Sequence, residues 1–109
     1  MITLFDFKAL DIRVGRILSV DDFPEAKDPA YKIIVDLGPL GKKQSSAQIT
    51  DLYSKEDLLG RKVLCVANLP PLKVAGFKSE VLILGACPEG ESVILLKLDD
   101  DVPEGTRIS

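Results

Sequence analysis

Residues 62–86 read KVLCVANLPPLKVAGFKSEVLILGA, two apolar stretches joined by a segment of different composition. The outer stretches, 62–68 and 80–86, are rich in Val, Leu and Ile, which is typical of strands buried on both faces. The adjacent prolines between them cannot donate backbone hydrogen bonds, and the glycine allows backbone geometry that is closed to other residues. The sequence therefore predicts two core strands and, at residues 68–80, a shaped loop.

This loop mixes polar and apolar side chains. A mixed loop on a rigid scaffold is a usual place for binding, but a proline-rich segment with a glycine is also a common connector. The residues alone leave both interpretations open.

Three further strands are expected before this region. Apolar residues alternate along 11–20, and Gly15 in the middle predicts a bend or bulge there. Residues 31–37 alternate more regularly and predict a second strand. Residues 42–49 have strand-like placement but few large apolar side chains, so they form either an edge strand protected by lysines or a face lined for a ligand.

Shorter elements complete the chain. Residues 54–59 have the signature of a capping box and end at Gly60, which predicts a short helix. Residues 92–98 and 106–108 predict two more strands, and residues 1–10 predict a turn or short helix.

The order strand, strand, strand, short helix, strand, strand is that of the OB fold, a five-stranded barrel with its helix between strands 3 and 4. We therefore expect an all-β domain over residues 1–109, with a lead at 1–10, the barrel at about 11–86 and extra C-terminal strands at 92–108. A generic β-sandwich is the rival fold.

Composition limits the function classes. Hydrophobic residues make up 46% of the chain, more than so short a fold needs, and the excess predicts a dimer. The chain has no apolar run long enough to insert in a membrane, and the start lacks the pattern of a signal peptide, so we expect a cytoplasmic protein.

Charge is unevenly distributed. The net charge of −3 argues against coating nucleic acid by bulk positive charge, yet residues 42–80 carry +3 while 1–41 and 81–109 carry −2 and −4. This middle third could meet phosphates, or it could be an ordinary solvated surface.

Catalysis is not expected. The chain has no histidine, no Cys-x-x-Cys pair and no phosphate-binding glycine motif, so the usual acid–base, nucleophilic and zinc arrangements are missing. No metal and no cofactor are expected, and Cys65 and Cys87 are interpreted as small buried hydrophobic residues that are kept reduced.

Several strings at consistent spacing resemble the CsaA family of small export-related chaperones, within the wider tRNA-binding-domain family. They are Asp11-Ile-Arg-Val-Gly15, Lys43-Gln-Ser-Ser-Ala-Gln-Ile49, Asn68-Leu-Pro-Pro71, Ala75-Gly-Phe-Lys-Ser-Glu-Val81 and Pro103-Glu-Gly-Thr106. The resemblance covers nearly the whole chain. It implies an OB-fold homodimer that binds unfolded or export-bound polypeptides, with recognition of the outer shape of tRNA as the alternative.

The resemblance also implies site residues. The RNA-facing positions carried over from the family are Lys43, Ser45, Ser46, Asn68, Lys73, Lys78 and Ser79, whose ammonium, hydroxyl and amide groups suit phosphate, ribose and base edges. Where the family's loop carries two consecutive cations, this chain has Leu72 before Lys73, which weakens the phosphate contact. The positions proposed for polypeptides are Leu72, Val74 and Phe77, either as exposed anchors or as side chains buried under the loop.

Overall fold

The computed structural model describes residues 1–90 and 92–109. The chain forms short helices and strands in the order α1 (Leu4–Ala9), β1 (Ile12–Asp22), β2 (Tyr31–Asp36), η1 (Gly38–Leu40), β3 (Lys42–Ala47), α2 (Lys55–Leu58), β4 (Lys62–Val66), β5 (Leu72–Val74), β6 (Phe77–Ser79), β7 (Leu82–Ile83), β8 (Gly85–Ala86), η2 (Pro88–Gly90), β9 (Ile94–Leu95) and β10 (Arg107–Ile108).

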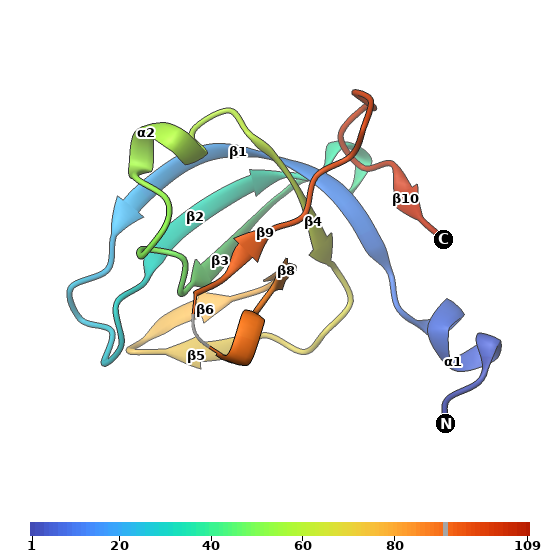
Figure 1. The fold of residues 1–109 in the computed structure, drawn as a ribbon, viewed down its shortest axis with the longest axis horizontal. Helices are drawn as coiled ribbons and strands as arrows, with labels where there is room; N and C mark the ends of the chain where they lie inside the picture. The colour runs from blue at the N-terminus through green and yellow to red at the C-terminus, as the bar shows by residue number, and fades with distance from the viewer. Residues whose placement is uncertain (91) are drawn as a thin grey trace.

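The main sheet is antiparallel and curls into a nearly closed five-stranded barrel with the strand order β3-β2-β1-β4-β7 (Figure 1). The short helix α2 lies between the third and fourth strands, and β10 adds to the N-terminal end of β1. The predicted all-β class and OB fold are therefore confirmed.

The barrel closes where β3 meets β6 of the hairpin and Glu80, the residue directly after it. The Glu80 N–H donates to the Gln44 carbonyl at 2.8 Å, and the Gln44 Nε2 donates to the Lys78 carbonyl at 2.7 Å. The Ser46 N–H donates to the Ser79 Oγ at 3.0 Å. Backbone and side-chain bonds thus replace a continuous ladder along this seam.

Alternating side chains of the barrel strands form the core. Ile33 and Val35 of β2, Val63 of β4 and Ile17 of β1 are all at most 1% exposed. They pack with Leu58 of α2, which the capping box of Ser54 and Asp57 holds in place as predicted.

The predicted irregularity at Gly15 lies elsewhere. The register of β1 against β2 shifts between Ile17 and Ser19, so the bulge is three residues further along. Gly15 is needed for close packing instead, because a Cβ there would lie 2.3 Å from Val35 Cγ1 and 2.8 Å from Leu37 Cδ2.

The predicted loop at 68–80 contains a β-hairpin of β5 and β6. Its two-residue turn places Ala75 at φ 47° and Gly76 at φ 82°, the left-handed geometry of a type I′ turn, which matches the twist of the flanking strands. The alternation of Leu72, Lys73 and Val74 is a strand signal that the prolines masked.

Other predicted strands are shorter than expected. The stretch 80–86 divides into β7 and β8, 92–98 contains only β9, and 42–49 contains β3. The lead 1–10 contains α1, in agreement with the expected short helix. None of the helices in the described residues is long and apolar enough to cross a membrane.

Candidate binding groove and basic hairpin

A groove with a cavity of about 550 Å³ runs beside the hairpin. Its walls come from the 26–30 loop, the end of β3, the segment 69–74 and the segment 79–87. Most of the lining is apolar, and three of its leucines remain open to solvent: Leu69 at 42%, Leu72 at 66% and Leu82 at 50% exposure. A groove of this kind accepts apolar side chains of many shapes.

The β5–β6 hairpin has two chemically different faces. Side chains alternate along a strand, so Lys73 and its cross-strand partner Lys78 lie on one face and the pair Val74 and Phe77 lies on the other. Val74 lines the groove together with Leu72. The structure therefore separates the two predicted lysines from the predicted polypeptide contacts by the thickness of the hairpin.

Phe77 is half-buried. Its ring packs edge-to-face on Phe23, with 5.5 Å between ring centroids, and the Lys32 Nζ lies 4.9 Å from the Phe23 centroid and 5.7 Å from that of Phe77. The contact between the two rings packs the hairpin against the loop that follows β1. Of the three predicted polypeptide contacts, Leu72 is exposed, Val74 lies half-buried on the groove wall and Phe77 serves packing.

The polar strand β3 presents its predicted site residues on different faces. Ser45 is 1% exposed, and its hydroxyl donates to the Val81 carbonyl at 2.8 Å. Ser45 therefore joins β3 to the segment before β7 and does not face a ligand, which corrects its expected role. Its neighbour Ser46 lines the groove with Ser79.

Lys43 shares the core-facing side of β3 with Ser45, at the end of the strand opposite Val35. Its side chain is half-buried, while Lys73 and Lys78 are exposed. Within the residues that the structure describes, none of these three lysines forms an ion pair. Their ammonium groups can therefore bind an anion. Lys43 lies on β3, whereas Lys73 and Lys78 lie on the two strands of the hairpin.

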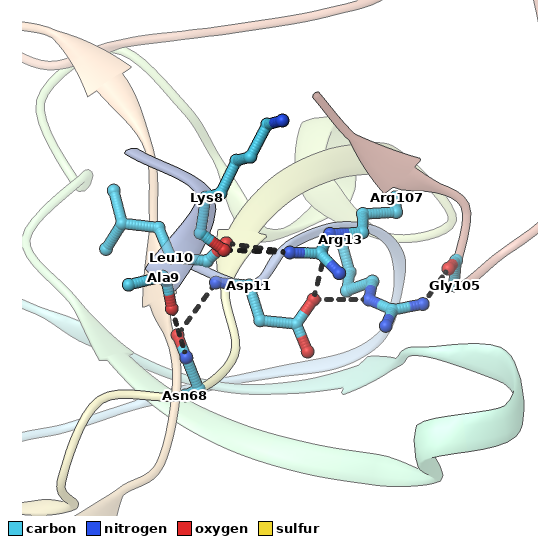
Figure 2. A network of polar contacts seen from close by, with 8 residues as sticks. All are labelled: Lys8, Ala9, Leu10, Asp11, Arg13, Asn68, Gly105 and Arg107. Atoms are coloured by element: carbon cyan, nitrogen blue, oxygen red, sulfur yellow. Dashed lines mark hydrogen bonds and ion pairs between the residues drawn. The ribbon is translucent and has the colours of Figure 1, made fainter. Parts of the chain in front are cut away.

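Both ends of the Asn68 side-chain amide form hydrogen bonds within the chain (Figure 2). Its Oδ1 accepts the Asp11 N–H at 2.9 Å, and its Nδ2 donates to the Ala9 carbonyl at 2.8 Å. The structure thus gives Asn68 a role in holding α1. The sequence did not indicate this contact, because the two partners are 57 or more residues apart.

Sequence reasoning also missed part of the groove wall. Leu69, Pro70 and Leu82 line the groove but carry no polar group that would mark them as a site. The apolar residues on both sides of the two prolines could have indicated this wall, because a loop that only connects two strands does not need them.

A second cavity of about 680 Å³ lies between residues 60–64 and 96–102 and carries charged residues. The Lys62 Nζ lies 2.5 Å from the Asp101 carboxylate, and this ammonium lowers the pKa of Asp101. The pKa of Glu104 is also lowered, by a backbone hydrogen bond and by the Arg16 guanidinium 2.7 Å away. These ions pair with one another and hold the 99–104 segment on the barrel.

In the described part of the chain, no three acidic or cysteine side chains lie close enough together to hold a metal ion. The expectation that both cysteines are buried is wrong for Cys87. Cys65 is buried in the core, and burial raises the pKa of its thiol to about 12, whereas Cys87 is exposed and lines the groove.

The family model described as "Putative tRNA binding domain" matches residues 12–107. Methionine–tRNA ligase of Thermococcus onnurineus is 46% identical over 103 residues, and methionine–tRNA ligase 1 of Bacillus anthracis is 41% identical over 107 residues. These alignments cover 94% and 98% of this chain but only 14% and 16% of the ligases. The chain thus corresponds to a small part of those enzymes.

Solved structures match the chain over its full length. The chaperone CsaA of Bacillus anthracis is 50% identical with a TM-score of 0.95, and CsaA of Picrophilus torridus is 48% identical with a TM-score of 0.93. The alignments cover all of this chain and 99% and 100% of those proteins. The chain belongs to the tRNA-binding-domain family, and in sequence and structure it is similar to the CsaA chaperones.

Proposed function

We propose that this chain is a non-catalytic binding protein that acts, like CsaA, as a chaperone for unfolded or export-bound polypeptides in the cytoplasm. The observation that carries the proposal is the apolar groove beside the hairpin, with Leu72 and Leu82 open to solvent. Similarity to CsaA supports it, since the alignment covers 100% of this chain and 99% of the CsaA of Bacillus anthracis.

The groove suits an extended polypeptide. Apolar side chains of a client would displace water from the leucines, and about 25 cal/mol is gained for each Å² of apolar surface removed from water. The Ser46 and Ser79 side chains on the wall can meet the client's backbone. Because apolar contacts are not directional, many client sequences would be accepted.

The proposal includes a homodimer formed through α1. This helix buries none of its residues, and Leu4 and Phe5 are 67% and 82% exposed. In Figure 1, α1 stands clear of the barrel. A second copy would cover these side chains, as the excess of hydrophobic residues in the sequence suggests.

A matched pair of leucine variants tests client binding. Leu72→Ser removes an exposed groove side chain, and Leu52→Ser removes a leucine of similar exposure, 52%, outside the groove. With fluorescent, reduced and carboxymethylated α-lactalbumin as the unfolded client, we expect Leu72→Ser to weaken binding about tenfold. The proposal fails if Leu72→Ser binds as wild type does, or if both variants weaken equally.

A second candidate function is tRNA binding, favoured by the adjacent cations Lys73 and Lys78 and by the family. It predicts that labelled tRNA binds at low salt and is released as salt rises, because each phosphate contact releases counterions. If tRNA binds tightly while the unfolded client does not bind, this second candidate replaces the first.

A further inference from the structure

The last turn of α1 is capped by side chains from two distant segments. Its final carbonyls have no partner inside the helix. The Asn68 Nδ2 donates to the Ala9 carbonyl at 2.8 Å, and the Arg107 Nη2 donates to the carbonyls of Lys8 at 3.1 Å and Leu10 at 3.4 Å (Figure 2).

Asn68 also fixes the junction between α1 and β1. Its Oδ1 accepts the Asp11 N–H, while the neighbouring Ala67 N–H donates to the Asp11 carbonyl at 2.7 Å. The Asp11 carboxylate accepts from the Arg13 Nε at 2.6 Å. The N–H and the carbonyl of Asp11 are therefore both bonded to the two residues that follow β4.

The orientation of α1 depends on these contacts. A six-residue helix is not stable alone in water, and α1 has no buried side chain to hold it on the barrel. Its N-terminal capping box of Thr3 and Asp6 stabilises the first turn but does not attach the helix to anything else.

The same asparagine begins one wall of the groove. Leu69 and Pro70 follow Asn68 directly and line the cavity, and Leu72 lies two residues further on. The prolines at 70 and 71 fix their φ angles, so this connection is stiff. If Asn68 moves, Leu69 and Pro70 of the groove wall therefore move with it.

We propose that Asn68 is a positioning residue that couples the pairing of two chains through α1 to polypeptide binding in the groove. This inference rests on the proposed function. When a second copy immobilises α1, Asn68 and the groove wall are held in one arrangement, so the protein loses less conformational entropy when a client binds. By linkage, a bound client strengthens pairing by the same factor.

The first experiment uses the wild-type chain. The dimer dissociation constant is measured by analytical ultracentrifugation with and without saturating carboxymethylated α-lactalbumin. We expect saturation to tighten pairing at least fivefold, within the usual range for coupled sites. Equal constants would overturn the coupling while leaving the groove and the dimer intact.

The second experiment uses variants. Asn68→Ala removes both hydrogen bonds, and Asn68→Asp keeps the shape but turns an acceptor toward the Ala9 carbonyl. We expect each variant to weaken pairing about tenfold, the scale of two neutral hydrogen bonds, and to weaken client binding as well. Gln44→Ala, which removes an amide bonded to the hairpin, is expected to leave pairing unchanged.

The outcomes are distinguishable. If Asn68→Asp pairs and binds as wild type does, the hydrogen bonds do not position α1 and the inference is wrong. If the wild type stays monomeric at all concentrations, the dimer of the proposed function fails, and the coupling fails with it. If a variant does not fold, as judged by circular dichroism, the wild-type linkage measurement still decides.

Discussion

Lys73 and Lys78 lie directly opposite one another across the β5–β6 hairpin. Like charges in this position destabilise a sheet by roughly 0.2–1 kcal/mol, because neighbouring strands hold the side chains close together. In the described residues neither lysine has a carboxylate partner. An anionic ligand would remove this repulsion.

Replacing both lysines by alanine should therefore weaken tRNA binding and reduce its dependence on salt. Two lost phosphate contacts lower the slope of log affinity against log salt by about 1.5. Filter binding between about 50 and 200 mM salt measures the slope, the range over which such contacts are lost. Lys97→Ala, an exposed cation outside the hairpin, is the control, and an unchanged slope in the double variant would remove the hairpin from the RNA site.

The two adjacent serines of β3 should behave differently. Ser45→Ala leaves the buried Val81 carbonyl without its donor and should lower the free energy of unfolding by about 1–3 kcal/mol. Ser46→Ala removes a half-buried hydroxyl and should change stability by less than about 0.5 kcal/mol. Urea unfolding compares them. Loss of tRNA or client affinity in Ser45→Ala without loss of stability would restore Ser45 to the ligand-binding surface.

Gly15→Ala should strongly destabilise the barrel. The new methyl group would overlap Val35 and Leu37 of the core, and overpacking of this kind costs typically 1–3 kcal/mol. Thermal unfolding by circular dichroism measures the loss. A variant as stable as wild type would mean that β1 and β2 separate more easily than their packing implies.

Acid should loosen the 99–104 segment. The pKa values of Asp101 and Glu104 are below their ordinary values of 3.8 and 4.5 in the folded chain. A lowered folded pKa stabilises the fold above the unfolded pKa, so this contribution is present above about pH 5 and is lost as pH falls through the folded values.

Urea midpoints at several pH values between about 2 and 6 test this, since the carboxylates titrate in that range. Asp101→Asn should lower the midpoint near neutral pH and flatten the acid dependence. If wild type and Asp101→Asn lose stability in parallel, other carboxylates account for the acid response.

Local patterns predicted much of the fold. The alternation at residues 31–37 identified β2, and the capping box identified α2, because both signals depend on neighbours in sequence. The bulge could not be placed from Gly15, since the register of β1 is set by packing against β2. The hairpin was hidden because prolines usually end a ladder, and here they precede one.

Tertiary contacts within the chain use the same chemistry as a ligand would, and the sequence does not distinguish the two. A serine hydroxyl in a polar strand and an asparagine after an apolar strand can face either a ligand or the chain itself. In the structure, Ser45 and Asn68 bond to carbonyls 36 and 59 residues away. Of the predicted site lysines, Lys73 and Lys78 are exposed and Lys43 is half-buried, and an ammonium group is rarely buried completely.

The contrast between the two cysteines provides a reporter. With its thiol pKa near 12, Cys65 stays protonated and shielded, so a maleimide dye at neutral pH would react with Cys87 alone. Because Cys87 lines the groove, the dye's emission would change as the groove fills. The unmodified sequence therefore already carries the attachment point for following client capture and release in real time.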